Sequence, residues 1–317
     1  MREIPPELLS GPFLRSRAVE LGVTSRMLDG QRFVRLFPRV YRLGDHEMTE
    51  ADWVRAAHLA LPGRAHLTGI TRIQRLGLDF GPRRPLRFVI VGDHHLAFDE
   101  IFLHRTKALP PITSDGVCVE AAFIAYCARA RVIDAIKVGD WLLHHGHLDL
   151  AAMIELAGSQ LWRDGADESL WVSNHLNSRS KSLKESELRA LLEFAGLPQP
   201  EVNVPVALDG VAEMEGDLVY RAYQTVVEYE GVQHQEDRAQ YTADLDRYAL
   251  FREHETGYVL ITKEHLASPR NVVRKVHRQL VEGGYDGPDP VFGERWRALF
   301  ARLRTVLGPR RPRAEAA

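Results

Sequence analysis

The chain has 317 residues, of which 45% are hydrophobic and 26% charged, and this composition excludes wholesale disorder. Its net charge of -2 excludes a protein that is basic throughout, and its 2 cysteines exclude a disulfide scaffold and fit a reducing cytoplasm. No apolar run approaches the roughly 18 residues of a membrane span, and the N-terminus lacks the apolar core of a signal peptide. We therefore expect a cytoplasmic protein of two or three domains with no membrane partner.

The near-zero total charge hides three segments of opposite sign. Residues 11–42 carry seven arginines against two acids, and residues 265–317 carry eleven basic residues against five acids. Between them, residues 179–264 carry nine basic residues against seventeen acids. Basic flanks can hold a polyanion by neutralising its phosphates, whereas an acidic centre repels a polyanion unless cations intervene. The alternative is that each segment only solvates its own surface.

The first basic segment has the pattern of a winged helix-turn-helix. A helix over 13–21 ends at Gly22, Thr24 can cap a second helix, and the run RFVRLFPRVYRL predicts a hairpin around Pro38. In such a module the second helix enters the major groove of DNA and the hairpin touches the backbone. The predicted DNA-binding residues are Arg26, Arg32, Arg35 and Arg39. The alternative is a small protein-interaction module.

The central third reads as a packed scaffold without a catalytic signature. It is predicted to contain four helices, over 50–62, 66–76, 118–144 and 148–157, and two paired strands, over 86–92 and 101–106. His144, His145 and His147 precede Gly146 or flank it at a helix end, where imidazoles satisfy carbonyl groups more readily than they bind metal. The predicted boundaries are a winged helix over 1–58, a helical and β scaffold over 59–160, a linker over 161–181, an α/β domain over 182–307 and a disordered basic tail over 308–317.

The last domain is predicted to follow the order helix, β-meander, helix, strand, helix. In the strand TVVEYEG the side chains alternate, so Val226, Glu228 and Glu230 share one face. If GDLVY and TVVEYEG form a hairpin that pairs Tyr220 with Thr225, the same register places Asp217 opposite Glu228.

Carboxylates in directly opposed positions have Cβ atoms roughly 4.5–5.5 Å apart and repel each other. A protein that keeps such a cluster normally neutralises it with a hard cation or raises a pKa, so the acids predict a Mg²⁺ site. The alternative is an edge strand whose acids point to water, and the apolar Val226, Val227 and Leu218 argue against it. Glu185 completes a Ser182–Glu185 capping box, but it also shares a helix face with Leu188 and Leu192, so both roles remain open.

Five pieces of residues 182–266 resemble, in order, the Vsr-related (very-short-patch-repair-like) endonuclease domains of the PD-(D/E)xK superfamily. They are ES at 185–186 before a leucine-rich helix ending AGLPQPEV, then GDLVY, VVEYEGVQH, DLDRYALF and GYVLIT. Residues 10–157 resemble the AbiEi-type antitoxin architecture, through LGVTSRML, the hairpin ending RVYRL and the later helix pattern.

The resemblance implies a restriction-endonuclease-like core in which Asp217 and Glu228 bind Mg²⁺ or Mn²⁺ and Glu185 supports them. The metal would lower the pKa of a water and stabilise charge on the scissile phosphate. Gln233 and His234 match the QH pair of this branch, and His234 suits general-base work, although it can instead cap the following helix. The sequence departs from the superfamily at Glu230, where a Lys is usual and many relatives of the branch carry Asp, and at Leu260 and Ile261, where relatives often hold an Arg.

The sequence thus predicts an α+β multidomain protein that joins a DNA-binding winged helix to a metal-dependent DNA endonuclease, with Glu185, Asp217, Glu228, Glu230, Gln233 and His234 as its catalytic set. The alternative function is a non-catalytic, antitoxin-like transcriptional repressor with a degenerate nuclease fold. Its partner would then be a toxin or a second copy of the chain. RNA remains an alternative substrate, because phosphate chemistry does not distinguish the sugars.

Overall fold

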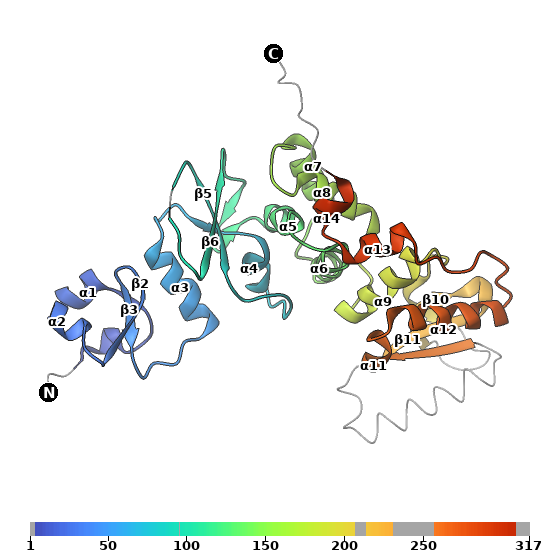
Figure 1. Ribbon diagram of the computed structural model, residues 1–317, viewed down its shortest axis with the longest axis horizontal. Coiled ribbons are helices and arrows are strands. Elements are labelled where there is room, and N and C mark those ends of the chain that lie inside the picture. The colour runs from blue at the N-terminus through green and yellow to red at the C-terminus, as the bar shows by residue number, and fades with distance from the viewer. Residues whose placement is uncertain (1–3, 95, 207–213, 231–256, 309–317) are drawn as a thin grey trace, which may run out of the picture. The chain divides into compact units, whose positions relative to one another are not determined.

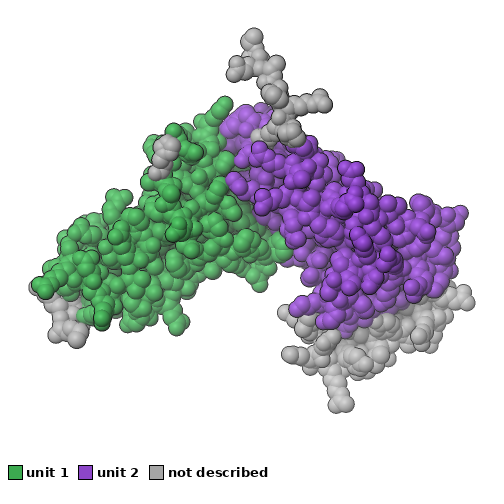
Figure 2. Space-filling view, viewed as in Figure 1, with its two compact units in different colours: residues 1–122 green, residues 123–317 purple. Residues whose placement is uncertain are grey.

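The computed structural model describes residues 4–94, 96–206, 214–230 and 257–308. The chain forms two compact units, residues 1–122 and 123–317 (Figure 2). Each unit mixes helices with small sheets. This agrees with the α+β class expected from the sequence. Among the described residues, no helix is both long enough and apolar enough to cross a bilayer.

The first unit begins with a three-stranded antiparallel sheet and two short helices. The helices and the hairpin follow in the predicted order, but Phe13 and Leu14, expected to begin the first helix, form a strand. These elements are β1 (Phe13–Leu14), α1 (Arg15–Glu20), α2 (Ser25–Leu28), β2 (Phe33–Phe37) and β3 (Val40–Leu43), and the sheet order is β1-β3-β2. Thr24 caps α2 by accepting a hydrogen bond from the Met27 backbone N–H, as expected. The hairpin turns at Pro38 and Arg39, and Arg39 has a positive φ of 67°. A Pro followed by a residue of positive φ is the backbone pattern of a type II turn.

The rest of the first unit packs around a second small sheet. Helix α3 (Glu50–Ala60) starts at a capping box in which the side chains and backbones of Thr49 and Asp52 bond reciprocally. Strands β5 (Leu86–Val91) and β6 (Ile101–Thr106) pair in parallel, which confirms the expected pairing, and β4 (His66–Leu67) adds antiparallel to β5. The smaller elements are α4 (Gly69–Gln74), β7 (Ile112–Thr113) and β8 (Gly116–Val117).

The single helix expected over 118–144 is wrong, because the chain forms α5 (Val119–Cys127) and α6 (Val132–His144) with a break between them. In the break, the Ala130 carbonyl accepts from the Leu303 N–H, and the Val132 N–H donates to the Ala301 carbonyl. These bonds to a distant segment replace helical bonds at positions 130–132. Tertiary pairing therefore ends a helix that the apolar periodicity would continue.

The polar stretch 161–181, expected to be an irregular linker, contains α8 (Ala166–Val172) and a 3-10 turn (Ser173–His175). Helix α8 buries Ala166, Ser169 and Val172 completely and Glu168 almost completely. It packs against α7 (Leu150–Ser159) and α6. The segment is thus part of the core of the second unit.

The second unit ends in a four-stranded mixed sheet of order β12-β11-β10-β9 (Figure 1). Its elements are α9 (Leu183–Phe194), β9 (Glu201–Val206), β10 (Met214–Tyr220), β11 (Thr225–Glu230), β12 (Gly257–Thr262), α11 (Lys263–Leu266), α12 (Pro269–Glu282), α13 (Glu294–Phe300) and α14 (Leu303–Leu307). Strands β9, β10 and β11 form an antiparallel meander, and β12 runs parallel to β11. Tyr220 pairs with Thr225, which confirms the predicted hairpin register.

Helices α9 and α12 lie on the same face of this sheet. Helix α9 contacts β10 and β11, α12 contacts β11 and β12, and the two helices contact each other. They bury apolar side chains such as Leu188 and Leu192 of α9 and Val272 and Val276 of α12. The sheet and these two helices form the frame that holds the acidic residues.

A buried ionic network fastens α9 to α6. The Arg189 guanidinium donates to the Asp140 carboxylate over 2.8 Å and to the His175 carbonyl over 2.8 Å, and it lies 3.4 Å from the Glu193 carboxylate. Asp140 is 0% exposed, and its other oxygen accepts from the Asn177 N–H over 2.7 Å. Glu193 also contacts the His175 imidazole over 2.7 Å. Because Arg189 is bonded on two sides, it fixes the orientation of the helix that carries Glu185.

Candidate active site

The β10–β11 hairpin brings Asp217 and Glu228 onto neighbouring strands. Leu218 pairs with Val227, and one further step of the same register places Asp217 opposite Glu228. The Asp217 carboxylate accepts a hydrogen bond from the Tyr229 backbone N–H over 2.9 Å, so it reaches across to the residue that follows Glu228. Asp217 is half-buried and Glu228 is only 7% exposed. The bond to Tyr229 ties the Asp217 side chain to the strand that carries Glu228, and the pairing of Asp217 with Glu228 stays a prediction.

The strand β10 is irregular next to Asp217. Gly216 and Val219 would face opposite sides of a regular strand, yet a Cβ atom at Gly216 would lie 2.7 Å from Val219 Cγ2 and 3.0 Å from Val226 Cγ1. The pairing of β10 with β9 skips the step between Gly216–Val204 and Leu218–Val202. At that step Asn203 has a positive φ of 47°, a conformation that Asn tolerates better than most residues. The register of the two strands is the same on either side of this step, so the irregularity is local and adds no residue to either strand.

Asn203 connects this irregular step to Glu185. Its side-chain amide donates to the Glu185 carboxylate over 2.7 Å and to the Arg179 carbonyl over 2.7 Å. The same Glu185 oxygen accepts from the Lys181 N–H over 2.9 Å, and Glu185 is 8% exposed. Ser182 caps α9, because its side-chain oxygen accepts a hydrogen bond from the Glu185 N–H. The Glu185 carboxylate accepts from the Lys181 N–H, where a capping box would have it accept from the Ser182 N–H. Glu185 is thus a buried acid at the start of α9, and the reciprocal capping box expected from the sequence is not formed.

Glu228 is oriented by a residue of the neighbouring strand. The Tyr258 hydroxyl donates to the Glu228 carboxylate over 2.7 Å. The parallel pairing puts Val226 beside Tyr258 and Glu228 beside Leu260, so both Glu228 and the tyrosine occupy the Val226 face. The aliphatic part of that face is made by Val204, Val206, Val219 and Val226. Such an apolar surround lowers the local dielectric and so strengthens the electrostatic interactions that a charged group makes there.

Of the other predicted catalytic residues, Glu230, Gln233 and His234, only Glu230 lies in the described part of the chain. Glu230 is half-buried at the end of β11, two residues beyond Glu228 and paired with Thr262. Gln233 and His234 lie outside the described residues. The sequence reasoning missed Asn203 and Tyr258. The lone Asn in the apolar run EVNVPV is a signal that could have marked an irregular step, whereas nothing in GYVLIT singles out its tyrosine.

The carboxylate oxygens of these side chains are the type of ligand that a hard divalent cation prefers. Mg²⁺ prefers oxygen ligands and is commonly held by one or two carboxylates with water and phosphate oxygens completing its shell. Asp217 and Glu228 supply two carboxylates, and Glu185 lies bonded to the strand next to them. Within the described ranges, no cluster of three or more His, Cys, Asp or Glu side chains has a metal-binding arrangement.

The four arginines predicted to bind DNA are all exposed on the first unit. Arg26 lies on α2, Arg35 on β2 and Arg39 in the β2–β3 turn, while Arg32 precedes β2. The main chain of Arg39 is anchored, because its carbonyl accepts from the Arg15 N–H over 2.8 Å.

The histidine cluster behaves as expected of a helix end. The ring of His145 contacts the Trp141 carbonyl in the last turn of α6 over 2.9 Å, and that of His144 contacts the Ser178 carbonyl over 3.2 Å.

Replacing Asn203 tests whether its amide positions Glu185. Asn203→Gly keeps a backbone that accepts positive φ but removes the amide, so we expect stability to fall by about 1 kcal/mol and nicking by about tenfold. Asn203→Ala removes the same amide and adds the strain of a left-handed residue, about 1–2 kcal/mol more. Chemical denaturation and a plasmid-nicking assay measure both effects. Full activity in Asn203→Gly would show that Glu185 needs no such support.

No protein-family model matches this chain, and no curated protein matches it at a significant level. The interpretation of the site therefore depends on the residues and contacts described above.

Proposed function

We propose that the second unit is a metal-dependent nuclease that hydrolyses phosphodiester bonds of DNA. The observation that carries the proposal is the placement of Asp217 and Glu228 on adjacent strands, each carboxylate bonded to its own neutral donor. The two residues lie on paired strands, where opposed carboxylates repel unless a cation or a proton neutralises them. A divalent cation bound by Asp217 and Glu228 would account for this placement.

Each residue has a distinct task in this proposal. Asp217 and Glu228 hold Mg²⁺ or Mn²⁺, and Glu185, fixed by Asn203 and Lys181, orients the attacking water. When bound, the ion lowers the pKa of a water and stabilises the charge that develops on the phosphate. The residues 179–264, with seventeen acids against nine basic residues, would otherwise repel the substrate. We also assign Gln233 and His234 to this site, with His234 as a base for the water, on their sequence positions alone.

We assign DNA binding to the first unit as a winged helix-turn-helix. Helix α2 and the β2–β3 hairpin present Arg26, Arg32, Arg35 and Arg39 to solvent, and α1 and α2 are joined by a short turn at Gly22. Arginines in such positions neutralise phosphates and position a recognition helix. The unit would deliver DNA to the nuclease or select its site.

The decisive experiment is nicking of supercoiled plasmid by the full chain with Mg²⁺ or Mn²⁺, and with EDTA. We expect conversion to open circles that needs the divalent ion. Calorimetry on the same protein with DNA present should detect binding of the ion. If wild type neither nicks nor binds the ion at millimolar concentration, the non-catalytic repressor is the correct function.

Substituting two arginines of the hairpin tests the first unit. The double variant Arg35→Ala, Arg39→Gly removes two charges, and glycine fits the positive φ at position 39 without strain. We expect weaker duplex binding and a salt dependence flattened by about 1.8 log units per log of salt, since each phosphate contact contributes about 0.9.

The matched control is Arg17→Ala, because Arg17 is exposed but already paired with Glu20 over 3.2 Å. Mobility-shift titrations at several salt concentrations compare the variants. Binding that is equal in the double variant and the control would favour the protein-interaction module instead.

A further inference from the structure

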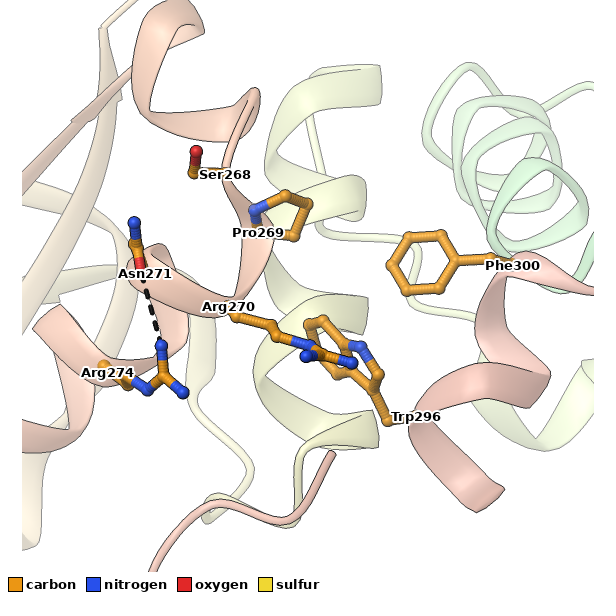
Figure 3. A pocket seen from close by; sticks show the side chains of 7 residues that line it. All are labelled: Ser268, Pro269, Arg270, Asn271, Arg274, Trp296 and Phe300. Atoms are coloured by element: carbon orange, nitrogen blue, oxygen red, sulfur yellow. Dashed lines mark hydrogen bonds between the residues drawn. The ribbon is translucent and has the colours of Figure 1, made fainter. Parts of the chain in front are cut away.

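An open groove lies at the start of α12, and none of the acids assigned to catalysis is among its lining residues. It has a volume of about 450 Å³, within the range of small-ligand sites. Two elements of the second unit form it, α12 with the residue before it and α13 (Figure 3). The lining residues are Ser268, Pro269, Arg270, Asn271, Arg274, Trp296 and Phe300.

The charged side chains that line the groove are two arginines, and no acidic side chain is among its lining residues. Arg270 and Arg274 are four residues apart on α12, so they share one face of the helix, and both are exposed. No acid lines the groove, and within the described part of the chain neither arginine forms a salt bridge. By contrast, Arg295 of α13 lies 3.6 Å from the Glu193 carboxylate. The groove therefore offers two cations to a ligand.

The geometry of the two guanidinium groups suits phosphate. Both lie over the ring of Phe292, at 5.5 Å for Arg270 and 5.3 Å for Arg274. Arg274 also donates to the Asn271 amide oxygen over 3.3 Å (Figure 3). A guanidinium held against an aromatic ring loses less freedom when it binds, and its planar fork matches phosphate oxygens.

The remaining walls are apolar. The rings of Trp296 and Phe300 are 5.4 Å apart and steeply inclined, and Pro269 lies on the opposite side of the opening from Phe300 (Figure 3). Trp296 is only 4% exposed, whereas Phe300 is 36% exposed and so presents an aromatic surface to solvent. A groove with a pair of arginines beside an exposed aromatic ring matches a ligand that carries both a phosphate and a flat base.

We propose that this groove binds one nucleotide of single-stranded DNA, with phosphates on Arg270 and Arg274 and the base against Phe300 and Pro269. The proposal rests on the proposed function in taking DNA as the substrate, and it adds a strand-holding site to the nuclease unit. Single strands fit better than duplex, because a paired base keeps its faces inside the stack. The eleven basic residues against five acids in 265–317 give the surrounding surface the sign that this ligand requires.

The test measures binding of a fluorescein-labelled oligothymidylate by the full chain without divalent ions, in an Asp217→Asn background that prevents cleavage. The double variant Arg270→Gln, Arg274→Gln should bind at least about tenfold more weakly, and its salt slope should fall by about 1.4, since each single-strand phosphate contributes about 0.7. The control Arg297→Gln, Arg304→Gln removes two exposed charges outside the groove and should change binding much less. Equal losses in the two double variants would overturn the proposal.

Phe300→Ala separates base recognition from charge. It should weaken binding of the oligothymidylate about tenfold and leave duplex binding unchanged. An abasic oligonucleotide of the same length should bind wild type as weakly as oligothymidylate binds Phe300→Ala. If the abasic strand, or poly-glutamate, binds as tightly as oligothymidylate, the groove recognises charge alone and the proposal is wrong.

These outcomes are distinct from those of the nicking assay. A wild type that nicks plasmid but shows no effect of the groove variants refutes the groove and retains the nuclease. A chain that binds oligothymidylate through Arg270 and Arg274 but never nicks retains the groove and refutes the nuclease.

Discussion

Asp217→Asn should lower plasmid nicking by at least about a hundredfold while the protein stays folded. Asp217 is one of the two carboxylates proposed to hold the ion, and its loss would take away several kcal/mol of transition-state stabilisation, where each 1.36 kcal/mol is a factor of ten in rate. The asparagine side-chain oxygen can still accept the hydrogen bond that the Tyr229 N–H donates to Asp217 over 2.9 Å. Because the change also relieves repulsion from Glu228, we expect an unchanged or higher melting temperature.

The control for this variant is Glu201→Gln, which removes a charge from the same sheet. Glu201 lies at the surface of β9, paired with Arg221 over 2.9 Å, and its side chain is 49% exposed. Nicking rates, ion binding by calorimetry and thermal unfolding should be unchanged in this control apart from a small loss of stability. Asp217→Asn that nicks like wild type would remove Asp217 from the catalytic site and with it the shared ion.

Arg189→Met should destabilise the second unit by about 3–5 kcal/mol, the cost of leaving buried carboxylates without their counter-ion. Asp140 has no exposed surface, and Glu193 is 5% exposed. Methionine fills much of the arginine volume, so the loss comes mainly from the charges. Arg189→Lys should recover only part of it, because an ammonium group cannot reproduce the bonds to Asp140, His175 and Glu193 together.

Lys184→Met on the same helix is the matched control. Lys184 contacts Glu187 over 2.9 Å but is 39% exposed, and Glu187 keeps its second partner Lys137 at 3.0 Å. We expect a change within about 1 kcal/mol. Urea denaturation followed by circular dichroism compares the two variants. A similar small change in both would show that the buried network contributes little to stability.

The loss in Arg189→Met should depend on pH. Burial raises the pKa of the Asp140 carboxyl, and the Arg189 charge opposes that rise. Burial also raises the pKa of Glu193, but the His175 hydrogen bond and the charges of His175, Arg189 and Arg295 hold it below its ordinary value. A carboxyl whose pKa is lowered on folding stabilises the folded state at pH values above its unfolded pKa. This stabilisation is lost as the pH falls through the folded pKa.

Without Arg189, the folded pKa of both carboxyls moves upward, so folding disfavours their charged forms at neutral pH. Near pH 4 the unfolded carboxyls are themselves about half protonated, and less of this penalty remains. The difference in unfolding free energy between wild type and Arg189→Met should therefore shrink from pH 7 to pH 4. A difference that grows toward acid pH would contradict the assigned charges.

The sequence alone predicts the central pairing of the candidate site. Side chains alternate along a strand, and only four residues connect Tyr220 to Thr225, so one register satisfies both runs and it is the observed one. The position of Glu185 on the leucine face of its helix likewise predicts a buried acid, and the side chain is 8% exposed. These features depend on local periodicity, which the order of residues contains directly.

Other features are decided only when distant segments meet. The break between α5 and α6 depends on bonds from residues 301 and 303, and the bond from Tyr258 to Glu228 depends on the parallel pairing of β12 with β11. The groove at Arg270 needs α13 to pack beside α12, so that Trp296 and Phe300 complete its wall. Periodicity describes which face of an element is buried, but not which element covers it. That choice is made by the packing of the whole unit, where each apolar face and each buried charge must find its partner.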